Sequence, residues 1–474
     1  MTEIDRLSAV ELRHRIAAGR VSASDALEAA ADRIALRNPA VNAMVTLCLD
    51  RARQEAGAAD DAVAAGRKLG PLHGVPFAVK DLNETEGVRT TWGSLEYKDH
   101  VPRRDCGLVA RMRAAGAILV GKSNTPEFGA GANTRNAVFG ATVNPLDTTR
   151  TCAGSSGGSA VALATRMVPL ATGSDTGGSL RVPAAFSGVV GVRPTPGLVA
   201  DEGRGNGWTT FAVEGPMART VGDAALMLSV LAADDPRDPM AGPVDRRDLA
   251  DARPADLNAL RVAASADLGI APVDDDIRAA FDGAVDALAP AVASVRRTDP
   301  PLADAHRVFD VLRAQAFVGS YKAIYDRNPD ALGPNVRTNV EMGLSMTLVD
   351  AADAHARHVR LYRRFVDFLD DHDVLICPAA PVSPFPVDEW YPAAVGGQAM
   401  DVYYRWIALA YALTLTAHPV VVVPCGTDRH GLPFGIQICG KRGRDADVLR
   451  IAAAIEARFA TVTGFAPARA AEDV

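Results

Sequence analysis

Apolar residues near the start of the chain recur at helical spacing rather than in alternation. Residues 8–19 begin with Ser8 and carry Glu11 three positions later, which is the capping-box arrangement of a helix N-terminus. The pattern therefore predicts a helix over 8–19. A second helix is predicted over about 24–36, ending before Pro39, because the residue that precedes a proline disfavours helical geometry.

Further along the chain, short apolar runs alternate with helical patterns. Residues 75–80, 117–121 and 167–172 are continuous apolar runs typical of buried strands. Helical patterns at 109–116 and 159–165 lie between these runs. Such alternation predicts an α/β fold in which a mixed central β-sheet is covered by helices on both faces.

The composition of the chain changes at about Pro236. Residues from about 236 to 370 are rich in Asp, Ala and Pro at helical spacing, and we expect them to form a peripheral helical segment. Apolar runs at 374–380 and 420–426 then predict a return to the sheet. The length of 474 residues allows either one large α/β domain or two domains.

Composition and charge exclude several classes of protein. The chain is 48% hydrophobic and 23% charged, which is typical of a globular protein with a large core. Its net charge of −7 provides no basic surface for nucleic acid or for an anionic membrane. The apolar stretch 409–426 is broken by Pro419, and the N-terminus lacks the layout of a signal peptide. We therefore expect a cytoplasmic protein that binds neither nucleic acid nor a membrane.

The cysteines indicate a reducing environment. Six of them are scattered along the chain without a CxxC pair, so we expect free thiols rather than disulfides. A zinc site would need clustered Cys and His ligands, and the sequence contains no such cluster. The sequence thus predicts no metal and no other cofactor.

Two serine clusters flanked by glycine carry the candidate chemistry. They are GSSGGS at 154–159 and DTGGS at 175–179. Glycine permits backbone angles closed to other residues and lets a substrate approach the main chain, so successive amides of the second cluster could bind a developing oxyanion. We expect Ser179 to be the nucleophile. The amides expected to form the oxyanion hole are those of Thr176, Gly177, Gly178 and Ser179.

The base for this serine cannot be a neighbouring histidine, because none lies in the stretch. Lysine can serve if burial depresses its pKa by several units. Lys80 ends the apolar run 75–80, and Lys122 ends a similar run. The residues alone favour Lys80 but leave both lysines open.

The motifs around these residues resemble the amidase signature family. HGVPFAVKD precedes GSSGGSA and GSDTGGSLRVPAAFSGVVGVRPT, GPMARTVGDAAL follows them, and the similarity extends to GLPFGIQICGKRGRDADVLRIAAAIE near the C-terminus. The resemblance implies one amidase domain over 1–474, with a catalytic core at about 60–235 and 374–460.

The resemblance also implies a Ser–cis-Ser–Lys triad and an acyl-enzyme. Ser179 matches the family's nucleophile, Ser155 its cis-serine and Lys80 its base. Ser155 would relay a proton from Ser179 to neutral Lys80, which would return it to the leaving amine.

Other residues at family positions are expected to support the triad or to line a pocket. Ser156 is expected to support the hydrogen bonding, and Asp175 and Arg181 are expected to pair as a structural clamp. The apolar character of WTTF and YYRW favours an uncharged aryl or alkyl acyl group. The candidate pocket residues are Gly129, Ala130, Gly131, Trp208, Phe211 and Tyr404, with Tyr403 and Trp406 beside them.

Several alternatives remain open from the sequence. GSSGGSA could cradle a phosphate, although it lacks the GK[ST] ending of a P-loop. The chain could also be the catalytic A subunit of a tRNA-dependent amidotransferase, or a non-catalytic scaffold of the same fold. We expect a stand-alone hydrolase of a small amide or acyl hydrazide, and the sequence is compatible with a homodimer.

Overall fold

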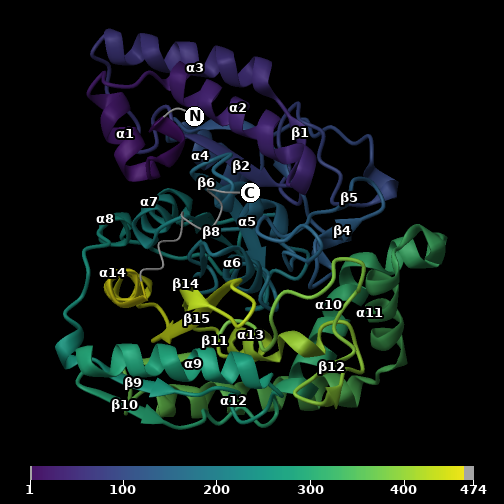
Figure 1. Cartoon of the computed structure of the whole chain (residues 1–474). Coiled ribbons are helices and arrows are strands. Elements are labelled where there is room, and N and C mark those ends of the chain that lie inside the picture. Colours follow the sequence, from purple (N-terminus) through teal and green to yellow (C-terminus); the bar gives the residue numbers. More distant parts are fainter. Residues whose placement is uncertain (1–2, 464–474) are drawn as a thin grey trace.

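An eleven-stranded mixed sheet runs through the molecule, as shown by a computed structural model that describes residues 3–463 (Figure 1). Parallel pairs join β2 to β3 and β6, and join β9 to β10 and β11, while the remaining neighbours are antiparallel. The strands in sheet order are β1 (Met44–Leu47), β3 (Ile118–Ser123), β2 (Pro76–Lys80), β6 (Leu170–Asp175), β8 (Val213–Ala218), β7 (Val190–Arg193), β14 (Val420–Thr427), β15 (Pro433–Gly440), β11 (Val374–Pro378), β9 (Arg261–Ala264) and β10 (Ser294–Arg297). Two short hairpins lie outside it: β4 (Arg135–Asn136) with β5 (Gly140–Ala141), and β12 (Ala394–Val395) with β13 (Gln398–Ala399).

Helices cover both faces of this sheet, as predicted. Successive side chains of a strand point to opposite faces. Phe77 and Val79 accordingly pack into one hydrophobic core and Ala78 into another. The helices are α1 (Ala9–Ala17), α2 (Ala23–Val41), α3 (Leu49–Ala64), α4 (Gly107–Ala114), α5 (Gly157–Ala164), α6 (Arg181–Ser187), α7 (Val221–Leu231), α8 (Arg246–Ala250), α9 (Asp275–Leu288), α10 (Ala305–Arg327), α11 (Pro334–Ser345), α12 (Leu348–Phe368), α13 (Ala408–Leu415) and α14 (Asp445–Thr463).

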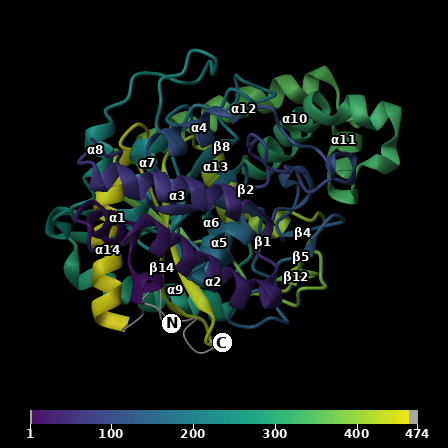
Figure 2. The ribbon, with the colours of Figure 1, turned by 90° about the horizontal axis from the view of Figure 1, so that it is seen from above.

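The two cores belong to different helices. Helix α5 packs on the face that holds Ala78, whereas α7 and α14 pack on the face that holds Phe77. Helices α10 and α11 lie at the opposite side of the molecule from α14 in both views (Figure 2). None of the helices in the described range is both long enough and apolar enough to cross a bilayer.

The first two helices match the sequence prediction except at one end. The capping box of Ser8 and Glu11 is present at the start of α1. Helix α2, however, continues through Pro39 to Val41, so the predicted end before the proline was wrong. Asn42 ends the helix in the left-handed conformation and its amide donates to Asn38, so the proline is accommodated within the last turn.

Strands β2, β3 and β6 begin and end close to their predicted positions, with one shift. β2 and β3 confirm the apolar runs 75–80 and 117–121, but β6 spans Leu170–Asp175 rather than 167–172. Arg166 adopts a left-handed conformation after α5, which delays the start of the strand. The shift matters because it places Ser174 and Asp175 on the sheet itself.

The segment from about 236 to 370 is not purely helical. It contains helices α8 to α12, but β9 and β10 add two strands to the edge of the central sheet. Each of these two strands has only four residues, which is too few for an alternating pattern of apolar positions to be recognised in the sequence. The same segment also supplies α10, which lies against the cavity that Ser155 and Ser179 line.

Close packing of α5 on β3 can be tested by substitution. A Cβ on Gly158 would lie 2.3 Å from the backbone nitrogen of Asn124 and 2.7 Å from the carbonyl oxygen of Ala43. We therefore expect Gly158→Ala to lower the free energy of unfolding by about 1–3 kcal/mol, the usual cost of overpacking. Thermal and denaturant unfolding would measure it.

The matched control is Gly57→Ala in α3, where an added Cβ meets no heavy atom within 4 Å. This change should stabilise the protein by about 0.5–1 kcal/mol through helix propensity. Equal effects of the two substitutions would contradict the close approach of α5 to the sheet.

Candidate active site

The candidate site is built where β2 and β6 end side by side. Lys80 is the last residue of β2, and its backbone amide donates to the Thr172 hydroxyl of β6 at 2.9 Å. The lysine side chain is completely buried. A strand thus fixes the direction in which a buried amine projects from the sheet.

The Lys80 amine is surrounded by hydroxyl groups. Its Nζ lies 2.7 Å from Oγ of Ser155, 2.9 Å from Oγ of Ser156 and 3.0 Å from Oγ of Ser174. A neutral amine has two N–H donors and one lone pair, so three hydroxyl neighbours can satisfy it without charge. Burial lowers the pKa of Lys80 to about 7, which favours this neutral form. The peptide bond between Gly154 and Ser155 is cis, as the resemblance implied.

Lys122 occupies a different environment, although the two lysines have similar local sequences. It is equally buried, but its amine contacts the Thr85 and Thr90 hydroxyls and lies 3.9 Å from the Asp81 carboxylate. Neither serine cluster contributes to these contacts. The geometry therefore brings Lys80, and not Lys122, to the serines.

The turn that carries Ser179 is held by a buried ion-pair network. Arg181 donates to both carboxylate oxygens of Asp175, at 3.0 and 2.9 Å, and also to the Ala410 carbonyl and the Gln437 side chain. Arg193 donates to the Asp175 carbonyl and lies 3.2 Å from its carboxylate. Burial opposes ionisation of Asp175, but the two guanidinium groups outweigh it and hold the pKa of the carboxyl below its usual range. Asp175 and Arg181 thus form the expected clamp.

The clamp also uses one of the four predicted oxyanion-hole amides. The Gly178 amide donates to the Asp175 carboxylate at 2.9 Å, so it does not point freely into the pocket. The amides of Thr176, Gly177 and Ser179 are left as candidates. Gly178 has a φ of 128°, and a Cβ there would lie 2.6 Å from the Ala410 side chain, so only glycine fits this turn.

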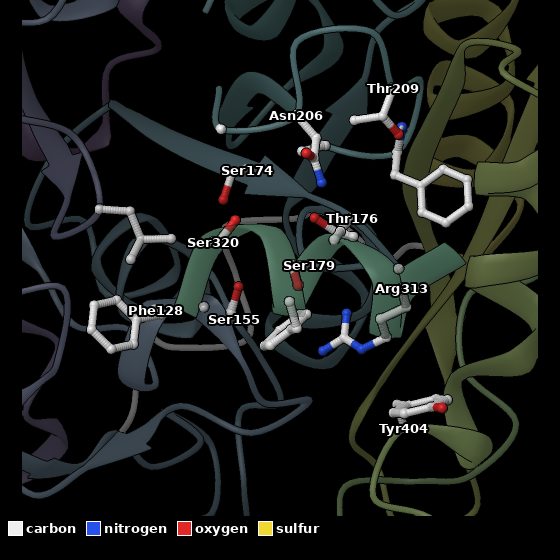
Figure 3. A pocket seen from close by; sticks show the side chains of 18 of the residues that line it. Phe128, Ser155, Ser174, Thr176, Ser179, Asn206, Thr209, Arg313, Ser320 and Tyr404 are labelled. Carbon is white, nitrogen blue, oxygen red and sulfur yellow. Dashed lines mark hydrogen bonds between the residues drawn. The ribbon is translucent and has the colours of Figure 1, made fainter. Parts of the chain in front are cut away.

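Ser155 and Ser179 line the same cavity, which has a volume of about 230 Å³ (Figure 3). This volume is smaller than that of most drug-sized ligand pockets, which indicates a small substrate. The wall opposite β6 comes from α10. Other lining residues include Leu82, Phe128, Thr176, Gly177, Asp201, Arg204, Asn206, Thr209, Glu214, Phe309, Arg313, Phe317, Ser320, Tyr321 and Tyr403.

Most but not all of the predicted pocket residues line this cavity. Gly129, Gly131, Phe211 and Tyr404 do. Ala130 lines a neighbouring cavity instead.

The two predicted tryptophans lie outside the cavity. Trp208 is 83% exposed at the surface, because its loop turns Asn206 and Thr209 inward, as Figure 3 shows. Trp406 is buried in the core. The expected aromatic wall from the 206–209 loop is therefore absent at position 208, and polar side chains take its place.

Three residues of the site have no role in the sequence prediction. Ser174 was visible within GSDTGGS but had no assigned role. Glu214 faces Ser174 across the β6–β8 pair, and burial raises the pKa of its carboxyl to about 8. Arg313 comes from α10, whose sequence carries no recognised motif. Only Ser174, which stands between the two serine clusters, had a signal that could have identified it.

The remaining chemistry-bearing groups lie apart from this cavity. All six cysteines are free, and burial raises the pKa of Cys48 to about 11. Within residues 3–463, no three His, Cys, Asp or Glu side chains lie together as a metal ion would require.

Comparison with known proteins identifies the family. The family model described as Amidase matches residues 25–449. This chain belongs to the amidase family. It is 32% identical to an acylamidase of Rhodococcus erythropolis over 454 residues, with 95% of each chain covered. It is also 36% identical to the A subunit of a glutamyl-tRNA(Gln) amidotransferase from Acidothermus cellulolyticus, covering 98% of this chain and 96% of the relative.

A solved structure supports the same assignment. A bacterial aryl acylamidase of the amidase signature enzymes superposes with a TM-score of 0.90 at 27% identity, covering 96% of this chain and 97% of that one. The predicted family and α/β fold are therefore confirmed. The family places this amidase among enzymes that cleave amides by hydrolysis.

Proposed function

We propose that this amidase hydrolyses the C–N bond of small carboxylic amides or acyl hydrazides through an acyl-enzyme on Ser179. The observation that carries the proposal is the 2.7 Å contact between the buried Lys80 amine and the Ser155 hydroxyl. Ser155 also lines the cavity that Ser179 enters. The contact between Lys80 and Ser155, and the cavity shared by Ser155 and Ser179, support these roles of base, relay and nucleophile.

The reaction begins with proton transfer away from Ser179. Ser155 accepts the Ser179 proton while passing its own to the neutral Lys80 amine, and Ser179 Oγ bonds to the substrate carbonyl carbon. The negative charge that develops on the carbonyl oxygen is stabilised by backbone amides of the turn, from Thr176, Gly177 and Ser179. The C–N bond then breaks as Lys80, through Ser155, returns the proton to the leaving nitrogen.

Water completes the cycle by the same path in reverse. It attacks the acyl carbonyl, and its proton passes through Ser155 to Lys80. The ester bond to Ser179 then breaks, and the proton returns to the serine oxygen. Hydrazine and ammonia are both small leaving groups, so the same residues serve amides and hydrazides.

Substitutions in the triad test this assignment directly. Ser179→Ala and Lys80→Met should each lower kcat by about a thousandfold or more, as is usual when a member of a catalytic triad is removed. A fluorophosphonate probe should label the wild type and not Ser179→Ala. Lack of wild-type labelling would instead favour a non-catalytic scaffold.

Lys122→Met is the matched control for Lys80→Met, since both lysines are fully buried on neighbouring strands. It should lower thermal stability, because Asp81 loses its cationic neighbour, and it should retain turnover. Equal loss of turnover in the two lysine variants would contradict the assignment of the base.

The pH profile provides a second test. Lys80 accepts a proton only when neutral, so kcat/KM should rise as pH increases through its pKa, near 7. Burial disfavours the ionised form of Glu214, but an ionised Glu214 carboxylate raises the pKa of Lys80, so Glu214→Gln should move this acid limb to lower pH. Glu341→Gln, an exposed change on α11, should leave the profile in place. An acid limb that stays fixed in Glu214→Gln would contradict the proposed coupling.

A second candidate function is that of an A subunit in a tRNA-dependent amidotransferase, favoured by the 36% identity to the Acidothermus cellulolyticus protein. Amides, esters and hydrazides that share one acyl group distinguish the two candidates. We expect the purified chain alone to cleave the amide or the hydrazide. Activity only with a partner protein and charged tRNA would support the amidotransferase.

A further inference from the structure

Arg313 is a cation in the wall of the active-site cavity. It projects from α10 and is only 7% exposed, yet it lines the cavity together with Ser155 and Ser179. Figure 3 shows its guanidinium group directed into the pocket on the side of Ser179 and Tyr404. A buried cation normally has an anionic partner, because removing its charge from water is costly.

No ion pair among residues 3–463 includes Arg313. Its Nε donates to the Asn339 side chain and its Nη2 donates to the Tyr403 hydroxyl, both of which are neutral. These two bonds orient the guanidinium plane. They leave Nη1 as a donor without a hydrogen-bond partner in the described part of the chain.

Aromatic rings hold the cation in place of a carboxylate. The Arg313 guanidinium carbon lies 4.7 Å from the Phe317 ring centre and 5.2 Å from that of Tyr404, with Phe309 and Tyr403 also within 6 Å. Cation–π contacts stabilise a desolvated guanidinium but use its faces rather than its N–H edge. The edge therefore stays available to a planar acceptor.

The other charged groups of the cavity are already compensated. Arg204 lies 3.3 Å from the Asp238 carboxylate and 4.0 Å from that of Asp201. Burial favours the neutral form of Glu214, and the charge that it does carry acts on Lys80. Arg313 thus leaves one uncompensated positive charge in a cavity that is otherwise balanced.

Arg313 comes from a helix that packs close to the turn of Ser179. Phe309, four residues earlier on the same face of α10, lies where a Cβ on Gly177 would be 3.0 Å from its ring. Four residues of helix advance about 6 Å along the axis. Ser179 and Arg313 also line one cavity of about 230 Å³, so a ligand that contacts both residues must be short.

We propose that Arg313 binds a carboxylate of the substrate, so that the preferred substrates are short amides or hydrazides that carry a free carboxylate. A charge-assisted hydrogen bond from the unpartnered Nη1 suits a carboxylate better than any uncharged group. The proposal rests on the proposed hydrolase function and specifies its substrate class. It replaces the uncharged acyl group that the aromatic sequence motifs favoured.

Two substrate pairs test the proposal and locate the carboxylate. Glutaramate against valeramide places it on the acyl side, and N-acetyl-4-aminobutyrate against N-butylacetamide places it on the amine side. We expect the wild type to prefer the charged member of one pair by about 10- to 100-fold in kcat/KM, the usual value of a charge-assisted hydrogen bond. Preference for the neutral member of both pairs would overturn the proposal.

Substitution of Arg313 must remove that preference. Arg313→Gln should abolish the ratio between charged and neutral members, and Arg313→Lys should retain part of it. Arg307→Gln, an exposed change on the same helix, should leave the ratio intact. If Arg313→Gln lowers thermal stability and slows both members equally, the role of Arg313 is structural and the proposal is overturned.

A binding measurement covers the case in which neither pair is hydrolysed. Glutarate should protect Ser179 from the fluorophosphonate probe in the wild type and in Arg307→Gln, and not in Arg313→Gln. Labelling without protection would overturn the carboxylate site and leave the hydrolase function standing. Absence of any labelling would instead overturn the hydrolase function on which this inference rests.

Discussion

A completely buried amine whose close neighbours are hydroxyl groups is the interaction on which the rest of this site depends. Burial penalises the charged form of any lysine, and a directly bonded carboxylate would restore that charge. Lys80 has three serine hydroxyls at hydrogen-bond distance, whereas Lys122, on the adjacent strand, has a carboxylate within 4 Å. Burial lowers the pKa of both lysines, but only Lys80 contacts the serines, because different loops reach the two side chains.

The nucleophile depends on a second constraint, which is the rigidity of its turn. Asp175 accepts from both Arg181 and the Gly178 amide, so the segment that carries Ser179 is fixed from both sides. One predicted oxyanion donor is used for this purpose. Three of the four predicted backbone amides therefore remain available to a ligand, and the clamp holds the turn that carries them in a fixed orientation.

The sequence could predict the parts of the site that lie within contiguous motifs. Ser155, Ser179 and Lys80 each stand in a glycine-rich loop or at the end of an apolar run, and the fold class followed from the alternation of strands and helices. The family and fold predictions are confirmed, and the structure places Lys80 in contact with Ser155, which lines the same cavity as Ser179. Short motifs were sufficient for these predictions because the turns and strand ends that they form involve residues close together in the sequence.

The parts that were missed depend on tertiary packing. Arg313 is one arginine among many on long helices, and only the approach of α10 to the turn at residues 176–179 gives it a place in the cavity. Trp208 was wrongly predicted to line the pocket because the direction of its loop, which the sequence does not reveal, turns its side chain toward solvent. Strands β9 and β10 were missed because a strand of four residues offers too few positions for an alternating pattern to appear.

The clamp on Asp175 depends on residues that are synthesised much later than Asp175 itself. Arg181 is anchored by Ala410 and Gln437, which follow it by more than two hundred positions. During synthesis, Ser179 therefore leaves the ribosome long before Ala410 and Gln437 do. The turn that carries Ser179 therefore reaches its fully anchored geometry only when α13 and β15, which hold Ala410 and Gln437, are in place.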